Sequence, residues 1–234
     1  MKTFWLLPNA PCAEMAPELW APPRLTEIVD RLTGLVAENE KNARLFLKSI
    51  KSTRVLQTYP IRLLNEHSEP ADIKELIKEI EKEGEWGLIS DQGLPSLADP
   101  GENVVQTLIK HGYKIKAVGA GSSIIHALLV TGFPAERFTF HGYLPKDDPE
   151  LSLSLKKLER DCQGGMTQIA IERPYENVKL IQTASKALKD TTTMAVVLDI
   201  GSDQEEVCIQ TIANWKKSQD LSRFQKRPAV FLFS

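Results

Sequence analysis

Residues 89–101 decide the fold of this chain, and they read Ile89-Ser90-Asp91-Gln92-Gly93-Leu94-Pro95-Ser96-Leu97-Ala98-Asp99-Pro100-Gly101. The apolar residues before this stretch predict a buried strand at 86–90, which glycine and proline then prevent from continuing. Apolar spacing after it predicts a helix at 102–111, closed by Gly112. Ligands of open α/β sheets bind where a strand turns into a helix in this way. The stretch therefore predicts either a ligand loop or an ordinary loop in which Asp99 caps the helix.

A second loop of small residues follows the next predicted strand. That strand is expected at 113–118, and it leads through Gly119-Ala120-Gly121-Ser122-Ser123 into an apolar helix expected at 122–131. Small residues let a ligand approach the backbone, and Ser122 or Ser123 can cap a helix whose free amides bind carboxylate or ribose oxygens. A Rossmann fingerprint is rejected because its third glycine and its acidic strand end are missing. The loop thus predicts contacts to a ligand other than a nicotinamide cofactor, with a purely structural turn as the alternative.

The alternation of strand and helix patterns predicts two α/β domains, at 1–118 and 119–234. In the first half, strands are expected at 3–7, 35–38, 61–64, 86–90 and 113–118, and helices at 24–32, 39–51, 71–83 and 102–111. This order predicts a mostly parallel sheet. In the second half, strands are expected at 137–141, 166–171, 194–199, 206–210 and 228–233, and helices at 122–131, 150–161, 174–189 and 210–217. The strands at 194–199 and 206–210 are too close for a helix between them, which predicts antiparallel pairing and a mixed sheet.

Composition argues against several classes of protein. The chain has 234 residues, is 42% hydrophobic and has a net charge of −2, so it can bury proper cores and has no global positive field that attracts nucleic acid. Its cysteines, Cys12, Cys162 and Cys208, are far apart, which argues against disulfides and against a zinc site. No apolar run approaches the roughly 20 residues that cross a bilayer, and the first residues lack a signal-peptide pattern. A cytoplasmic protein with no metal and no membrane partner is expected.

Any affinity for nucleic acid must come from local clusters of basic residues. The first cluster is a stripe on one side of the helix expected at 39–51, made of Lys41, Arg44, Lys48 and Lys51. It spans an arc of about 80°, since a helix advances about 100° per residue, and it faces away from the apolar residues Ala43, Phe46, Leu47 and Ile50. A second cluster contains Lys216, Lys217, Arg223, Lys226 and Arg227. Each cluster predicts either a nucleic-acid surface or an ordinary solvated face.

Six motifs of the chain, taken in order, resemble those of one family. They are Ser90-Asp91-x-Gly93-x-Pro95 with Asp99-Pro100-Gly101, then Gly119 to Ser123, Thr131-Gly132-Phe133-Pro134, Arg137-Phe138, Gly142-Tyr143-Leu144-Pro145 and Ile171-Glu172-Arg173-Pro174-Tyr175. With these motifs the chain resembles the tetrapyrrole methylase superfamily, the class III S-adenosylmethionine-dependent methyltransferases. It is most similar to the branch that methylates a cytidine ribose 2′-hydroxyl in small-subunit ribosomal RNA. The resemblance covers nearly the whole chain.

The resemblance implies a methyltransferase that binds S-adenosylmethionine in a cleft between its two domains and forms a homodimer. Carried over by position, the expected cofactor contacts are Pro8, Ile89, Ser90, Asp91, Gly93, Pro95, Ser122, Ser123, Ile171 or Glu172, and Leu198 or Asp199. Contacts to the substrate, ribosomal RNA, are expected at Lys41, Arg44, Tyr143 and Tyr175. A ribose hydroxyl needs a general base, for which the candidates at expected strand ends are Glu38, Glu40 and Glu172. Glu172 has a structural alternative, as the cap of a helix whose first turn contains Pro174.

Two segments depart from the family pattern. The first ligand loop is Pro8-Asn9-Ala10-Pro11, without the usual glycine, at the start of a proline-rich stretch over 8–23 that is expected to be irregular. Glu38-Asn39-Glu40-Lys41 replaces the branch's Glu-Asp-Thr-Arg, so an amide stands where a carboxylate is usual. These changes weaken the transfer of the RNA substrate more than that of the cofactor. Two alternatives therefore stay open: a small-molecule (tetrapyrrole-like) methyltransferase and a non-catalytic binding protein that keeps the cofactor fold.

Overall fold

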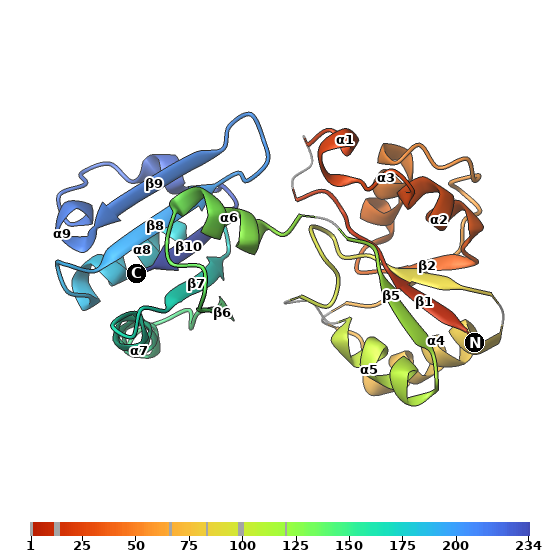
Figure 1. Ribbon diagram of the computed structural model, residues 1–234. Coiled ribbons are helices and arrows are strands. Elements are labelled where there is room, and N and C mark those ends of the chain that lie inside the picture. Colours follow the sequence, from red (N-terminus) through yellow and green to blue (C-terminus); the bar gives the residue numbers. More distant parts are fainter. Residues whose placement is uncertain (1, 12–14, 66, 83, 98–100, 120) are drawn as a thin grey trace. The chain divides into compact units, whose positions relative to one another are not determined.

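The computed structural model describes residues 2–11, 15–65, 67–82, 84–97, 101–119 and 121–234. The chain divides into two compact units, Met1–Ser122 and Ser123–Ser234, each built on its own sheet (Figure 1). They are called unit 1 and unit 2 below. Each has a buried apolar core of its own, as expected for a domain.

Unit 1 is an α/β unit in which every strand pairing is parallel. Its strands are β1 (Thr3–Leu6), β2 (Gly34–Ala37), β3 (Ile61–Leu63), β4 (Trp86–Leu88) and β5 (Lys114–Ala117). Its helices are α1 (Pro17–Trp20), α2 (Leu25–Arg31), α3 (Glu40–Ser49), α4 (Pro70–Lys82) and α5 (Glu102–Lys110). The strand order in the sheet is β3-β2-β4-β1-β5.

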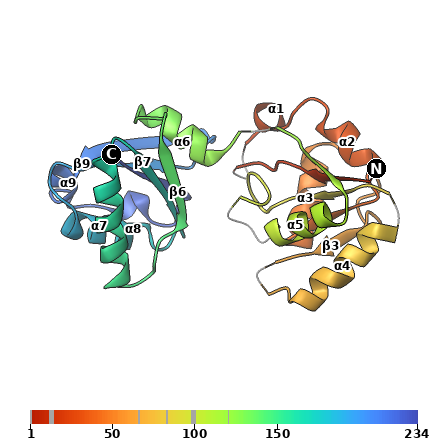
Figure 2. The same ribbon diagram turned by 60° about the horizontal axis from the view of Figure 1, so that its bottom comes forward.

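Side chains alternate along the strands of unit 1, so both faces of its sheet are buried under helices. On β1, Trp5 packs with Leu25 of α2 and with α3, whereas Phe4 packs on the opposite face with Ile80 of α4 and with α5. Figure 2 shows the ribbons of these helices beside the strands of unit 1. Because both faces are covered, a ligand of this unit has access to the ends of the strands and their loops rather than to the faces of the sheet.

Unit 2 contains a mixed sheet. Its strands are β6 (Phe138–Tyr143), β7 (Thr167–Glu172), β8 (Thr193–Leu198), β9 (Glu206–Thr211) and β10 (Ala229–Phe233). Its helices are α6 (Ser123–Thr131), α7 (Glu150–Cys162), α8 (Asn177–Ala187), α9 (Ile212–Trp215) and the 3-10 helix η1 (Ser222–Phe224). In the order β6-β7-β10-β8-β9, only β6 and β7 pair in parallel. Among the described residues, α6 packs on one face of this sheet, and α7, α8 and α9 pack on the other.

The predicted fold class, an α/β protein with a mostly parallel first sheet and a mixed second sheet, is confirmed. The antiparallel pairing expected between 194–199 and 206–210 occurs between β8 and β9. Gly112 follows the end of α5 with φ 78°, a left-handed conformation that glycine adopts more readily than residues with a side chain.

Two local predictions for unit 1 are wrong. The stretch 8–23 is not irregular throughout, because it contains the short helix α1, which begins at Pro17, where proline is tolerated. The helix expected to run to residue 51 ends at Ser49, and Lys51 follows it with φ 54°. Lys51 is therefore not part of the basic stripe on this helix.

The helices of unit 2 are shorter than expected at two places. α8 begins at Asn177, so Pro174 lies in the preceding turn, which the amide of Glu176 closes by donating to the Arg173 carbonyl at 2.8 Å. Glu172 is thus not the cap of α8. α9 begins only at Ile212, because β9 continues to Thr211 through its pairing with β8.

Several expectations from composition can be compared with the described residues. None of their helices is long and apolar enough to cross a membrane, and none of their His, Cys, Asp and Glu side chains form a cluster of three that could hold a metal ion. Cys162 and Cys208 are free thiols, and burial raises the pKa of each to about 11. Both are thus protonated at neutral pH and weak nucleophiles. Cys12 lies outside the described residues.

Candidate functional site

The carboxyl ends of the unit 1 strands lie at one edge of the sheet, because all the strand pairs are parallel. The neighbouring strands β2, β4, β1 and β5 lead into the loops that begin near Glu38, Ile89, Pro8 and Gly119. The predicted cofactor loops of unit 1, which follow β1, β4 and β5, are therefore brought together with the loop of Glu38, at a place called the unit 1 edge below. Ser122 ends this unit and Ser123 begins α6.

Asn9 ties the first of these loops to the loop after β4. Its side-chain Nδ2 donates to the carbonyls of Ser90 and Asp91, each at 3.0 Å, and its backbone amide donates to the Gly93 carbonyl at 2.8 Å. Its Oδ1 accepts from the amide of Ala10 at 2.8 Å. Asn9 was not predicted as a site residue. Its position in the short loop after a strand, between Pro8 and Pro11, was a usable signal, because asparagine side chains commonly bond to backbone in turns.

Asp91 presents a carboxylate at the unit 1 edge. Its backbone amide donates to Glu38 Oε1 at 3.0 Å, and its carbonyl accepts from Asn9. The carboxylate itself is half-buried and makes no hydrogen bond or ion pair with any residue that the structure describes. The backbone of Asp91 is thus fixed by two other loops, while its carboxylate takes no part in holding this loop to the described residues.

The rest of the loop after β4 is sharply turned. Ile89 and Ser90 are buried, and the Ser90 hydroxyl donates to the Gln92 carbonyl at 2.9 Å. Gly93 has φ 71°, a conformation that strains residues with a side chain, and Pro95 is buried. Asp99 and Pro100, the helix cap and part of the motif expected here, lie outside the described residues.

The loop after β5 is open around its glycines. A Cβ atom built on Gly119 or on Gly121 would contact nothing within 4 Å, so packing inside the chain does not require glycine at either position. Ala120, between them, lies outside the described residues. Close approach of a ligand to the backbone is a physical reason for small residues at such a place.

The predicted residues of unit 2 also lie at one edge of its sheet. Tyr143, Glu172 and Leu198 end β6, β7 and β8, which run in the same direction. Ala229, the first residue of β10, pairs with both Glu172 and Leu198. This place is called the unit 2 edge below. Leu198 is fully buried, so only its backbone, or the following Asp199, can meet a ligand there.

Glu172 is the most buried of the general-base candidates. Its side chain is 8% exposed, and burial, the largest effect, raises the pKa of its carboxyl above the ordinary value. Its Oε1 accepts a hydrogen bond from the amide of Arg173 at 2.7 Å. A carboxylate in such surroundings is a better proton acceptor than one in water.

The other two candidates have different surroundings. Glu38 accepts the Asp91 amide, so its carboxylate supports the loop after β4. Glu40 is exposed and forms an ion pair with Arg44 one turn further along α3. Of the three candidates, Glu172 is the one that is buried and whose carboxyl has a raised pKa.

The two predicted substrate tyrosines are exposed. Tyr143 is 51% exposed, and the guanidinium of Arg173 lies 4.9 Å from the centre of its ring. Gly142, with φ 66°, lies in the irregularity of β6 that turns this strand end. Tyr175 is 72% exposed in the turn before α8. Exposed aromatic rings at a strand edge can stack on bases or other flat groups.

The basic stripe on α3 borders a surface hollow of about 640 Å³. Its lining residues are Glu40, Lys41, Arg44, Leu45, Lys48, Leu56 and Gln57. The guanidinium of Arg44 binds Glu40 and donates to the Leu56 carbonyl, so its charge is largely compensated. Lys41 and Lys48 form no ion pair with a residue that the structure describes. Lys51 lines another hollow, next to Pro22.

The second basic cluster is mostly compensated by carboxylates. Lys216 pairs with Asp190, Arg223 pairs with Glu206, and Arg227 pairs with both Asp199 and Glu206. Its three paired cations therefore offer little free charge to a phosphate backbone.

Comparison with known proteins identifies relatives over most of the chain. Residues 22–215 match the family model of the tetrapyrrole (corrin/porphyrin) methylases. A protein named ribosomal RNA small subunit methyltransferase I from Leptospira borgpetersenii is 28% identical over 78% of this chain and 70% of its own length. A protein of the same name from Thermotoga maritima is 30% identical over 54% of this chain and 55% of its own length. The chain therefore spans little more than half the length of some of these relatives.

Solved structures share the fold at low sequence identity. A uroporphyrin-III C-methyltransferase from Thermus thermophilus, complexed with S-adenosylhomocysteine, has a TM-score of 0.59 at 14% identity and covers 99% of this chain and 97% of its own. Cobalt precorrin-4 methyltransferase, a cobalamin biosynthetic enzyme, has a TM-score of 0.63 at 12% identity and covers 100% and 94%. The family predicted from the six motifs is confirmed by the family model, and the chain belongs to the tetrapyrrole methylase family of S-adenosylmethionine-dependent methyltransferases.

Proposed function

We propose that this protein transfers the methyl group of S-adenosylmethionine to a ribose hydroxyl of small-subunit ribosomal RNA. The observation that carries the proposal is the unit 1 edge, where Asn9 holds the Ser90-Asp91 motif against the first loop. The names of the matching relatives support ribosomal RNA as the acceptor. A protein with this substrate would act in the cytoplasm. The homodimer that the resemblance implies stays a prediction.

The residues at the unit 1 edge fit this cofactor. The carboxylate of Asp91 has no partner among the described residues, so it can accept hydrogen bonds from the ammonium or hydroxyl groups of a cationic ligand. The open space beside Gly119 and Gly121 lets such a ligand reach the backbone. When bound, the cofactor supplies a methyl group on a sulfonium, whose departure leaves a neutral thioether.

The chain's own residues then have two tasks. Backbone groups and the Asp91 carboxylate at the unit 1 edge hold the cofactor in position, and positioning supplies much of the acceleration of such a displacement. We assign the second task to Glu172, whose buried carboxylate takes the proton of the attacking ribose hydroxyl as the oxygen–carbon bond forms.

The hollow beside α3 fits an RNA strand. Lys41 and Lys48 are free to bind phosphates, and Leu45, which is 53% exposed, adds an apolar surface to the same hollow. The charge of Arg44 is compensated by Glu40, so we expect Arg44 to shape the hollow more than to bind a phosphate.

Reversing the charge of this hollow should weaken RNA binding. We expect the double variant Lys41→Glu with Lys48→Glu to bind small ribosomal subunits more weakly and to lower the salt dependence by about 0.7–0.9 in log–log slope per lost phosphate contact. Filter binding over a series of salt concentrations measures both effects. The matched control, Lys156→Glu with Lys157→Glu on α7, makes the same charge change at exposed positions of unit 2. Equal weakening in both variants would mean that the stripe is an ordinary solvated face.

The proposed function is tested by transfer of a radiolabelled methyl group from S-adenosylmethionine. Small ribosomal subunits from a strain that lacks this protein are one acceptor, and a small-molecule extract of that strain is the other. Label in the ribosomal RNA supports the proposal. Label only in the extract would establish a small-molecule methyltransferase instead, and cofactor binding without any transfer would indicate a non-catalytic binding protein.

A further inference from the structure

Arg227 occupies a central position at the unit 2 edge, although its sequence neighbours mark it only as one member of a basic cluster. It lies two residues before Ala229, which pairs with Glu172 at the end of β7 and with Leu198 at the end of β8. The topology therefore places residue 227 beside two loops that carry predicted site residues. Along the sequence, those two loops are about 25 and 50 residues away from Arg227.

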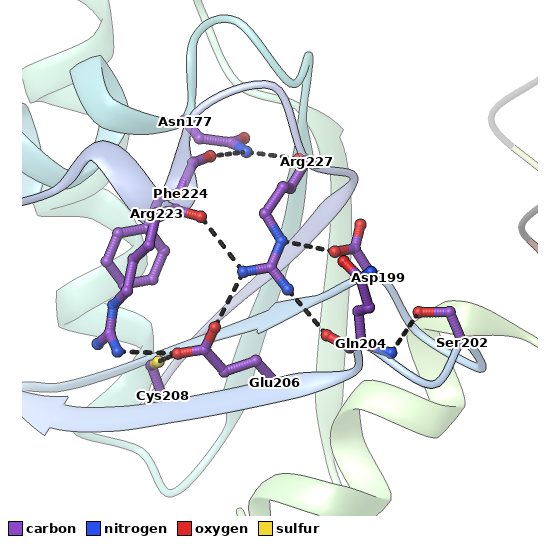
Figure 3. Close-up of polar contacts among 9 residues, drawn as sticks. All are labelled: Asn177, Asp199, Ser202, Gln204, Glu206, Cys208, Arg223, Phe224 and Arg227. Carbon is purple, nitrogen blue, oxygen red and sulfur yellow. Dashed lines mark hydrogen bonds and ion pairs between the residues drawn. The ribbon is translucent and has the colours of Figure 1, made fainter.

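The guanidinium of Arg227 is bound on several sides, as Figure 3 shows. Its Nε donates to Asp199 Oδ2 at 2.5 Å, and its Nη2 donates to the Gln204 carbonyl at 2.8 Å. Its Nη1 donates to Glu206 Oε2 at 2.9 Å and to the Arg223 carbonyl at 3.3 Å. With two carboxylates beside it and a side chain that is only 23% exposed, this cation is not available to an RNA phosphate.

Arg227 thereby forms hydrogen bonds to both ends of the turn that joins β8 to β9. This turn begins at Asp199, which has φ 46°, a left-handed conformation that is uncommon for residues other than glycine. The Asp199 amide donates to the Pro228 carbonyl at 3.0 Å, so backbone and side chain hold the same residue. The bonds to Asp199 and to the Gln204 carbonyl offset the strain of this conformation and fix the path of the turn.

The segment around Arg227 also holds the loop after β7. The buried side chain of Asn177 donates from Nδ2 to the carbonyls of Phe224 and Arg227, at 2.9 Å and 2.7 Å. The amide of Lys226 donates to the Pro174 carbonyl at 2.9 Å. One short segment thus connects the loop that follows Glu172 with the turn that follows Leu198.

We propose that Arg227 is a positioning residue for the cofactor, because it fixes the turn after β8 in the conformation that binds S-adenosylmethionine. It acts through Asp199 and the Gln204 carbonyl and touches neither cofactor nor RNA. This inference rests on the proposed function. Lysine cannot replace it, since an ammonium lacks the planar fork that reaches Asp199, Glu206 and a carbonyl together.

The test is the affinity of the full chain for S-adenosylhomocysteine, measured by titration calorimetry. We expect Arg227→Lys to weaken binding about tenfold or more, because charge-assisted bonds that hold the turn are lost. Asp199→Asn, which keeps the size of the side chain and tolerates the left-handed conformation, should weaken binding similarly. The double variant should be no weaker than either single variant, since both changes remove the same contact.

The matched control is Arg223→Gln. Arg223 lies on the same segment and binds the same Glu206, but its side chain makes no contact with Asp199 or Gln204 among the described residues. We expect Arg223→Gln to lower the melting temperature without changing the affinity for S-adenosylhomocysteine. Equal affinities of wild type and Arg227→Lys, or equal losses in Arg227→Lys and Arg223→Gln, would overturn the inference. A wild-type protein that does not bind would instead overturn the proposed function.

Discussion

Glu172→Gln is expected to lower kcat for methyl transfer by about 10²–10⁴-fold, the usual contribution of a general base. Glutamine keeps the size of the side chain and can still accept the hydrogen bond that Arg173 donates from its amide. It cannot take the proton of a ribose hydroxyl. Glutamine also keeps an acceptor oxygen for any contact that position 172 makes to the cofactor, so the affinity for S-adenosylhomocysteine should change much less than the rate. Single-turnover transfer to small ribosomal subunits measures the rate, and calorimetry measures the affinity.

The pH dependence of the same variant separates catalysis from stability. Glu172 must be ionised to act, and burial raises the pKa of its carboxyl above the ordinary 4.5, so wild-type activity should fall with decreasing pH before an exposed carboxylate would titrate. The contribution of Glu172 to folding stability changes with pH in the opposite direction. A carboxyl whose pKa is raised by folding stabilises the fold most at low pH, and that contribution is lost as pH rises through the raised pKa. At neutral pH, Glu172→Gln should therefore be at least as stable as wild type.

Glu176→Gln is the matched control for this prediction. Glu176 lies in the turn that follows β7, four residues after Glu172, and its carboxylate is 3.6 Å from the ammonium of Lys146. Its removal should leave kcat at neutral pH unchanged. The charge of Glu176 contributes less to the raised pKa of Glu172 than burial does, so the pH profile should shift only slightly toward lower pH. If Glu172→Gln retains the wild-type rate while Glu38→Gln loses it, the proton acceptor belongs to unit 1 and the assignment made for Glu172 is wrong.

The fold could be predicted because its signals are local. The strands β4 and β8 are short apolar runs bounded by turn residues, and the helices α3 and α5 show apolar residues at helical spacing. Such patterns depend only on neighbours within a few residues, so they give the order of the elements and the parallel or mixed nature of each sheet. The ends of elements were harder to predict. Lys51 and Pro174 lie beyond or ahead of their helices because turn hydrogen bonds compete with one more helical turn.

The site was less predictable because its contacts join distant parts of the chain. Asn9 bonds to carbonyls about 80 residues away, and Arg227 bonds to a carboxylate 28 residues away. Neither partner can be read from spacing, since the sheet topology brings them together. The free charge of a basic cluster is hard to predict for the same reason. The sequence contains the cations of the second basic cluster, but only the structure shows that Lys216, Arg223 and Arg227 are paired with acidic side chains.

Asp91→Ala is expected to abolish cofactor binding that calorimetry can detect while leaving the melting temperature unchanged. The two bonds that hold this residue come from its backbone, its amide donating to Glu38 and its carbonyl accepting from Asn9, and alanine keeps both. The carboxylate that is lost has no partner among the described residues, so the fold should not depend on it. Asp91→Asn keeps the shape and a hydrogen-bond acceptor but not the charge, and so isolates the attraction to a cationic ligand.

Asn9→Ala is the variant to compare with Asp91→Ala. Its side chain holds two carbonyls of the loop after β4, so the variant should lose both stability and affinity, by disordering the loop that Asp91→Ala leaves in place. Thermal unfolding and titration with S-adenosylhomocysteine are applied to both variants. Together they distinguish a residue that binds the cofactor from a residue that supports the loop after β4. An Asp91→Ala protein that binds like wild type would show that the motif loop serves packing alone. An Asp91→Ala protein that unfolds early would show that its carboxylate has a structural partner.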